Sequence, residues 1–152
     1  MRKFLPFIII GAILLIGYSY FKGINNTAVT LDQNVKESWG NVETSYQRRN
    51  DLIGNLVKTV QGAAEYEKGT LTAVIEARAK ATSVTIDPSN VTPEQLAQFQ
   101  QAQGGMTSAL SRLLVTVEQY PSLKANENFL KLQDELASTE NQILTARTRY
   151  NE

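Results

Sequence analysis

Apolar residues recur along the middle of the chain in alternating steps of four and three. This spacing places them on one face of an α-helix and is the heptad pattern of helices that pack against one another, as in a coiled coil. It predicts an all-α fold built from packed helices. The predicted seam, in which Arg49 is the one charged residue, comprises Trp39, Val42, Tyr46, Arg49, Ile53, Leu56, Val60 and Ala63.

The same register continues further along the chain without a phase slip. It passes Glu67 and Thr70 and returns to small apolar residues at Val74, Ala77, Ala81 and Val84. Glycines in this segment each cost about 1 kcal/mol relative to alanine in a helix, but no proline interrupts it. We therefore expect one continuous helix over about residues 31–84, which would be ~80 Å long at 1.5 Å per residue.

The next segment, TIDPSNVTPEQL, predicts a turn over residues 86–92. Thr92 is a suitable N-cap, Pro93 suits the first helical position, and Gln95 completes a capping box. A second helix is expected over residues 93–119, before Pro121, whose ring cannot continue the hydrogen-bond ladder. Its seam, with Gln103 as the polar exception, comprises Leu96, Phe99, Gln103, Met106, Leu110, Leu113, Val117 and Tyr120.

A third helix is expected over residues 122–151, with Ser122 or Asn126 as its N-cap. The second and third helices then form an antiparallel hairpin, each arm ~40 Å long. They would cover only half of an ~80 Å partner, so either the long helix breaks or other copies of the chain cover it. The final residues, TARTRYNE, lack a C-cap glycine or a following proline, as expected of a shortened chain. The third helix has its apolar residues at Phe129, Leu132, Leu136, Ile143 and Tyr150.

The N-terminus contains an uncharged apolar run from Phe4 to Phe21, preceded by Arg2 and Lys3 and followed by Lys22. About 20 apolar residues are needed for a helix to cross the ~30 Å core of a bilayer. We predict an N-terminal transmembrane anchor over residues 1–24, followed by a helical domain over residues 28–152. The alternative is a cleaved signal peptide, but no small-x-small cleavage site follows the run.

The charges that flank this run predict its orientation. Positive residues concentrate on the cytoplasmic side of membrane segments, which favours a cytoplasmic N-terminus and a domain on the other side. Tyr18, Tyr20 and Phe21 would form an aromatic belt at the membrane surface. The prediction is therefore a single-pass protein of the bacterial inner membrane with an extracytoplasmic domain.

Composition excludes several classes of function. Fifteen basic and fifteen acidic residues leave no net charge to attract nucleic acid. The chain has no cysteine and no histidine, which removes thiolate nucleophiles, imidazole acid–base catalysis and the usual zinc ligands. No glycine-rich phosphate-binding motif is present. We expect no enzymatic activity, no cofactor and no metal site.

Three motifs carry a resemblance to a known family. They are the RRNDLI segment that begins at Arg48, the EAR segment that begins at Glu76, and YPSLKANENF from Tyr120 onward. Together with the sequence around them, from about Leu31 to Glu152, they resemble the LemA family of single-pass bacterial membrane proteins. The resemblance implies a soluble helical bundle of three to four helices without an established enzymatic activity, and a role in scaffolding or membrane shaping.

Two features depart from the family pattern. Gly54 stands where we would expect proline, so a kink there should be softer. Family members also continue past Tyr150 and Asn151 with a further helical segment, which puts the fourth helix of the bundle in question.

Charged and polar residues gather in the first half of the predicted long helix. One interpretation has Arg48, Asp51 and Asn55 in solvent, with Arg49 reaching a carboxylate on a facing helix. A second interpretation is a buried ion network that fixes helix register and partner choice, at a cost in stability. A catalytic or ligand-binding role is the third. The candidate partners on the third predicted helix are Glu127, Asp134, Glu135 and Glu140, and the candidate interaction residues are Trp39, Tyr46, Arg48, Arg49, Asp51, Asn55, Glu76 and Arg78.

Two functional hypotheses follow. In the first, the chain is a membrane-anchored helical scaffold that self-assembles into a homo-oligomer and shapes or organises the membrane. In the second, it is an adaptor or regulator that receives a helix of a membrane protease or sensor protein in a groove.

Overall fold

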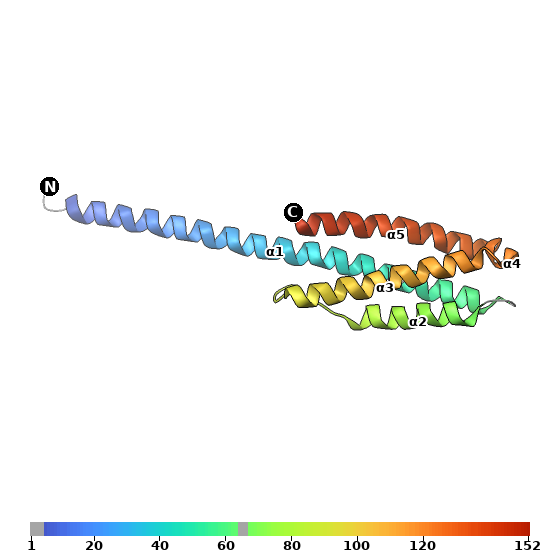
Figure 1. Cartoon of the computed structure of the whole chain (residues 1–152). Coiled ribbons are helices and arrows are strands. Elements are labelled where there is room, and N and C mark those ends of the chain that lie inside the picture. The colour runs from blue at the N-terminus through green and yellow to red at the C-terminus, as the bar shows by residue number, and fades with distance from the viewer. Residues whose placement is uncertain (1–4, 64–66) are drawn as a thin grey trace. The chain divides into compact units, whose positions relative to one another are not determined.

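The computed structural model describes residues 5–63 and 67–152, with side chains from residue 10 onward. In these ranges every regular element is helical, which confirms the all-α prediction. The chain divides into two compact units, Met1–Glu37 and Ser38–Glu152. The helices, labelled in Figure 1, are α1 (Leu5–Gln61), α2 (Lys68–Ser83), α3 (Pro93–Val117), α4 (Pro121–Lys124) and α5 (Glu127–Asn151).

The expectation of one helix over residues 31–84 is wrong at both ends. Helix α1 already begins at Leu5, because the sequence between Lys22 and Leu31 contains no proline to stop it. It ends at Gln61, and α2 starts at Lys68. The predicted seam crosses residues 64–66, which lie outside the described residues.

Helix α2 folds back along α1 instead of extending it. The Nε atom of Arg78 donates a hydrogen bond to the backbone carbonyl oxygen of Asn50, 28 residues earlier, at 2.8 Å. In a straight helix these residues would be ~42 Å apart, at 1.5 Å per residue. Gly62 directly follows the last residue of α1, and glycine costs about 1 kcal/mol relative to alanine in a helix, which favours ending α1 there.

The described part of the second unit is an up-down-up-down bundle of α1, α2, α3 and α5. Contacts between α1 and α5 pair early residues with late ones: Trp39 with Tyr150 and Arg49 with Glu140. Helices α2 and α3 lie side by side in Figure 1 and are joined by a short connection. The fourth helix of the bundle is therefore α2, which comes from the second half of the predicted long helix.

The signals at the start of α3 are confirmed. Thr92 accepts a hydrogen bond from the backbone N–H of Gln95 at 3.2 Å, and the Gln95 side chain accepts one from the Thr92 N–H at 3.1 Å. In the predicted turn the Asp87 carboxylate accepts from the N–H of Ser89 at 2.9 Å. Helix α3 ends at Val117, two residues earlier than expected.

The third predicted helix, residues 122–151, is divided. The single turn α4 ends at Lys124, and after Ala125 the extended backbone of Asn126 breaks the helix. The Asn126 side chain then accepts a hydrogen bond from the N–H of Phe129 at 3.0 Å and caps α5. Of the two predicted caps, Asn126 serves this role, and Ser122 lies within α4.

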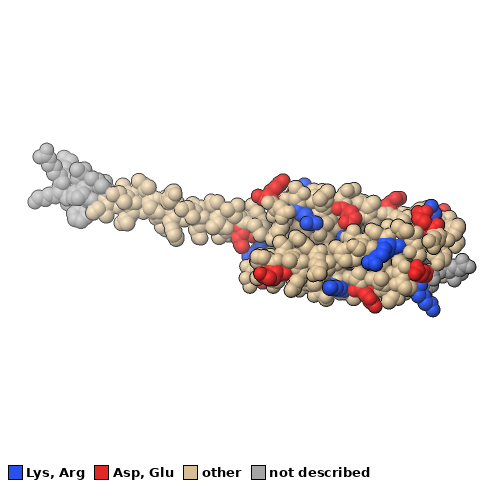
Figure 2. All heavy atoms as spheres, viewed as in Figure 1, with Lys and Arg blue, Asp and Glu red and all other residues tan. Residues whose placement is uncertain are grey.

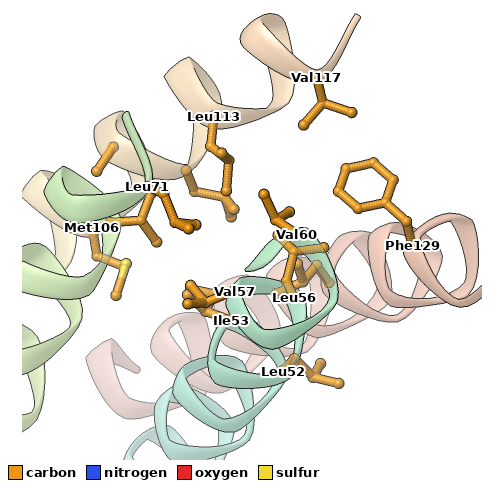
Figure 3. Close-up of a cluster of buried hydrophobic side chains, with 14 of the residues drawn as sticks. Leu52, Ile53, Leu56, Val57, Val60, Leu71, Met106, Leu113, Val117 and Phe129 are labelled. Carbon is orange, nitrogen blue, oxygen red and sulfur yellow. The ribbon is translucent and has the colours of Figure 1, made fainter. Parts of the chain in front are cut away.

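The heptad seam of the second unit forms its core. Its members from Trp39 to Val60 are all buried, and Ile53, Leu56 and Met106 are each 0% exposed. Figure 3 shows how side chains from α1, α2, α3 and α5 converge on one apolar space. Burying each large aliphatic side chain contributes about 1.5–3 kcal/mol, so this cluster is the main source of the bundle's stability.

A second, smaller cluster gathers aromatic residues around Trp39, Tyr46 and Phe99. On the face of this unit seen in Figure 2, basic and acidic residues are interspersed rather than segregated. No single-sign patch on that face suggests binding to a polyanion.

The first unit contrasts with the bundle. From Ile10 to Glu37 every residue is exposed, apart from the half-buried Gly11. In the described part of the chain, no helix meets the length and hydropathy needed to span a membrane. The predicted anchor over residues 1–24 begins outside the described residues, which start at Leu5.

Candidate functional site

Arg49 occupies a core position of α1 and is only 2% exposed. The heptad spacing places it there between Tyr46 and Ile53, both buried. A buried guanidinium is costly unless its charge is paired and its N–H groups find acceptors. Its surroundings therefore decide what this position does.

Three acceptors surround the end of the Arg49 side chain. Its Nη1 donates to Glu140 Oε1 on α5 at 3.1 Å and to Thr107 Oγ1 on α3 at 3.3 Å. Its Nη2 donates to Gln103 Oε1, also on α3. The guanidinium carbon lies 4.9 Å from the centre of the Tyr46 ring, a cation–π distance. One side chain of α1 thus contacts two other helices.

Gln103 extends this network to α2. Its Nε2 donates to the backbone carbonyl oxygen of Ala81 at 3.3 Å. Through Arg49 and Gln103 the network connects α1, α2, α3 and α5. Because hydrogen bonds depend steeply on distance and angle, sliding any helix by a fraction of a turn would break it.

The network pairs one positive side chain, Arg49, with one negative side chain, Glu140. Glu140 neutralises Arg49, and its side chain is 43% exposed, so the pair reaches the surface at α5. In residues 5–63 and 67–152 no cluster of acidic residues could hold a metal ion. The arrangement is suited to fixing helix register.

Arg78 of α2 makes a second close contact with α1. In addition to its bond to Asn50, its guanidinium lies against Gly54, where an added Cβ would come within 3.1 Å of Nη2. Glycine at this position gives the guanidinium room to cross α1. The sequence predicts that a glycine in this helix either bends it or lets a neighbour approach closely, and at Gly54 the structure shows the close approach.

Trp39 and Tyr46 belong to the aromatic cluster. The ring centre of Phe99 lies 5.6 Å from that of Trp39 and 5.0 Å from that of Tyr46, in edge-to-face geometry. Tyr150 contacts Trp39 at 5.1 Å. These contacts join α1 to α3 and α5 at the end of the bundle opposite α4.

The remaining predicted residues lie at the surface. Arg48, Asp51, Asn55 and Glu76 are exposed, and none of them forms a salt bridge with a described residue. Asp51 and Asn55 do line a groove of about 480 Å³ between α1 and α2, together with Arg78. The structure therefore separates the predicted set into a buried group and a surface group.

Sequence reasoning identified Glu140 only as one of four candidate partners and did not include Thr107. The signal for Gln103 was present, since it is the polar exception in the α3 seam as Arg49 is in the α1 seam. Two polar residues in facing apolar seams must pair, because each would otherwise remain unsatisfied.

Comparison with known proteins identifies the family of this chain. The LemA family model matches residues 38–152, the whole second unit and the entire Arg49 network. The chain belongs to the LemA family. It is also similar to magnetosome proteins named MamQ and to a protein named LemA.

The magnetosome protein MamQ 1 of Paramagnetospirillum magneticum is 29% identical over 143 residues, which cover 83% of this LemA-family chain and 53% of the relative. MamQ of Magnetospirillum gryphiswaldense is 27% identical over the same length, with the same coverage. Protein LemA of Metamycoplasma hominis is 25% identical over 147 residues, covering 95% of this chain and 64% of the relative. The chain spans about half the length of the MamQ proteins that it matches.

Proposed function

We propose that this LemA-family chain is a membrane-anchored, non-enzymatic helical protein that self-associates into homo-oligomers and organises the bacterial inner membrane. One observation carries the proposal: the first unit exposes large apolar side chains along its whole described length. The similarity to proteins named as magnetosome proteins is consistent with an organising role. The bundle would lie on the extracytoplasmic side.

The anchor accounts for the first part of this exposed surface. Ile13, Leu14, Leu15 and Ile16 are between 62% and 71% exposed and lie on all sides of the helix. A helix that is apolar all round is stable where lipid or protein surrounds it, not in water. The apolar run that contains them starts at Phe4, outside the described residues, and ends at Phe21 before Lys22.

Self-association accounts for the second part. Beyond Lys22 the exposed residues Ile24, Ala28, Leu31 and Val35 are spaced by four, three and four, so they form one face of α1. Lipid does not cover this stretch, since it carries Asp32 and Lys36. Anchors hold all copies in one plane, which raises the local concentration of this face and favours pairing with a second copy.

Because α2 folds back along α1, the proposed interface is a different part of α1 from the one that a continuous long helix would offer. The sequence left two possibilities, a break in the long helix over residues 31–84 or cover of its exposed half by other copies, and in the structure the helix breaks between Gln61 and Lys68. In the structure α2, α3 and α5 cover α1 in the second unit. The proposed interface is therefore the face formed by residues 24–35.

The first test is the mass of the full chain in mild detergent, measured by light scattering corrected for the micelle. We expect a discrete oligomer for the natural chain and a monomer for the double variant Leu31→Asp, Val35→Asp. The control, Asn26→Asp with Gln33→Asp, adds the same two charges on the opposite side of the helix and should leave the oligomer intact. A monomeric natural chain would refute self-association.

The anchor requires a separate test. The variant Leu14→Arg, Leu15→Arg should release the chain from membranes on alkaline extraction, because arginine near the bilayer centre costs about 2.5–3.5 kcal/mol. Val29→Arg, beyond the predicted span, is the control and should stay in the membrane fraction. Release of the natural chain under the same conditions would refute the anchor.

A second function, as an adaptor for a membrane protease or sensor protein, is favoured by the groove between α1 and α2. Its volume is about 480 Å³, and Ile75 lies in it with 42% of its surface exposed between charged neighbours. A helix with one apolar anchor residue would fit such a groove. Ile75→Asp should then remove a co-purifying membrane protein without changing the mass of the chain, whereas Val115→Asp, an exposed site outside the groove, should retain it.

A further inference from the structure

The groove between α1 and α2 has a charge balance that indicates what fills it. Its lining contains two basic side chains, Lys58 and Arg78, and one acidic side chain, Asp51. Neither cation forms a salt bridge with a described residue. Ile75, which is 42% exposed, adds an apolar side chain to the groove surface. The groove therefore suits an apolar side chain that is accompanied by carboxylates.

Arg78 is held in a fixed position in this groove. Its Nε atom donates to the backbone carbonyl oxygen of Asn50 at 2.8 Å, and its guanidinium lies against Gly54. The residue is half-buried. Because the guanidinium is already oriented, little side-chain freedom is lost when a carboxylate binds to its remaining N–H groups.

The N-terminal part of α5 carries the complementary pattern. Leu130 is 45% exposed, and exposed carboxylates lie three residues before it, at Glu127, and four residues after it, at Asp134. This spacing places all three side chains on one side of the helix, and they are called the acidic stripe below. Lys131 lies beyond the two carboxylates, on the side away from Leu130. Neither carboxylate forms a salt bridge with a described residue.

The acidic stripe and the groove lie at the same height along the bundle. In the two contacts between α1 and α5 described above, a step of ten residues along α1 corresponds to ten residues back along α5. Continuing this register places Asp134 level with Asn55 and Leu130 level with Thr59. The α1 residues that line the groove run from Asp51 to Gln61. Two copies that stand side by side in the same orientation therefore bring the stripe of one level with the groove of the other.

Helices α2 and α5 lie at opposite edges of the bundle in Figure 1, so a copy cannot place its own stripe in its own groove. We propose that the groove of one copy binds the acidic stripe of a second copy, with the carboxylates facing the two cations and Leu130 against Ile75. Each copy then offers a different surface to each neighbour, so the contact is heterologous and links copies into rows. The inference rests on the proposed anchor, which gives all copies the same orientation.

This contact is small, because it involves a few side chains on each partner. A stable interface buries about 800 Å² on each partner. The contact therefore depends on the high local concentration of anchored copies in a membrane. In detergent the rows should separate and leave the oligomer that forms through residues 24–35, so the two interfaces can be tested separately.

Cross-linking in vesicles tests the groove contact. The chain has no cysteine, so an introduced cysteine reports one position. Purified full chains carrying Ile75→Cys or Leu130→Cys, one of them with a mass tag, are mixed in phosphatidylglycerol vesicles and treated with a short bis-maleimide. We expect the mixed dimer to form about tenfold faster than in a mixture of Ile75→Cys with Leu144→Cys. Leu144 is the matched control, an exposed leucine of α5 that lies ~21 Å further along the helix. Equal rates would overturn the inference.

Exchange of two charges tests the recognition. Lys58 and Glu127 are both exposed, so reversing their charges should leave the bundle folded, which circular dichroism checks. Lys58→Glu in the copy with Ile75→Cys should slow cross-linking about fivefold, and so should Glu127→Lys in the copy with Leu130→Cys. The two reversals together should restore the rate. An unchanged rate in either single variant, or no recovery in the pair, would contradict the proposed recognition.

The outcomes separate this inference from the proposed function. An oligomer in detergent without specific cross-linking in vesicles would leave self-association through residues 24–35 standing and refute the groove contact. A monomer in detergent with specific cross-linking in vesicles would refute the first interface and support the groove contact. If cross-linking is absent and Ile75→Asp releases a co-purifying membrane protein, the groove belongs to the adaptor function and the inference is wrong.

Discussion

Helix α1 contains two stretches that differ in whether their apolar side chains are exposed or buried. From Ile10 to Glu37 the large apolar side chains are exposed, whereas from Ser38 to Gln61 they are buried. Both stretches are helical and both carry apolar residues at helical spacing. The difference lies in what covers them, because α2, α3 and α5 pack on the second stretch.

The comparison shows that an apolar face indicates the need for a partner without identifying it. In the second stretch the partner comes from the same chain. In the first stretch we propose lipid and a second copy. Helices derive most of their stability from such packing, so the two stretches should respond differently to the same substitution.

The largest expected difference between the two stretches is in the loss of stability when leucine is replaced by alanine. Leu56→Ala should destabilise the bundle by about 3 kcal/mol, because it leaves a cavity in a fully buried site. Leu31→Ala, where the side chain is 58% exposed, should change the unfolding free energy of the bundle by less than about 0.5 kcal/mol. Chemical denaturation of the full chain in detergent, followed by far-UV circular dichroism, measures both. Equal effects would contradict the distinction between the two stretches.

The next effect concerns the buried ion pair. Glu140→Ala should cost about 2–3 kcal/mol, since it leaves the Arg49 guanidinium buried without its counter-charge. Asp134→Ala, an exposed carboxylate on the same helix, is the control and should cost less than about 0.5 kcal/mol. The double variant Glu140→Ala, Arg49→Leu should recover part of the lost stability. If it does not, the cost comes from packing and not from charge.

Replacing glycine by alanine should change the stability of the bundle by a smaller amount, with opposite sign at two sites. Gly40→Ala has free space around the new Cβ and should stabilise α1 by up to about 1 kcal/mol. Gly54→Ala should destabilise the bundle by about 1 kcal/mol, because Arg78 must move and weaken its bond to Asn50. Thermal unfolding detects both. In an Arg78→Ala background Gly54→Ala should become stabilising, and a persistent loss there would refute this explanation.

The smallest effect concerns the exposed pair in the first stretch. Lys36 contacts Asp32 at 2.8 Å, with both side chains about half exposed. Asp32→Asn should therefore change stability by only a few tenths of a kcal/mol. It should also leave the oligomeric mass unchanged, because Asp32 is not a member of the apolar face. A dissociated oligomer would show that this pair, not the apolar face, holds copies together.

Much of the fold could be predicted from local signals. The Thr92 capping box and the Asn126 cap depend on residues within one turn of each other, so they are visible in the sequence. The seam from Trp39 to Val60 was also visible, because burial follows helical periodicity.

The reversal between α1 and α2 could not be predicted in this way. Val74 and Ala81 are buried as the seam predicted, but they face the same core after the chain turns back. The register is identical whether one straight helix continues past Gln61 or a second helix starts at Lys68 and runs back along the first. No proline or Asn-Gly turn marks the reversal, so periodicity alone does not distinguish the two.

The carboxylate that pairs with Arg49 could not be predicted from the sequence, for a related reason. Four carboxylates on the third predicted helix were equivalent in the pattern, and only the packing of α5 against α1 selects Glu140. A cavity of about 260 Å³, lined by α1, α3 and the connection that precedes α3, was not predicted at all. It depends on how α3 and this connection approach α1, which no local signal encodes.

The Arg49 network also affects how the bundle opens. If α5 detaches, a buried charge loses its carboxylate, and if α3 detaches it loses both remaining acceptors. Partial opening of one helix is therefore almost as costly as unfolding the whole bundle, so the bundle should behave as a single cooperative unit. The backbone amides of α3, α5 and the second stretch of α1 should then exchange their hydrogens with solvent in one concerted event.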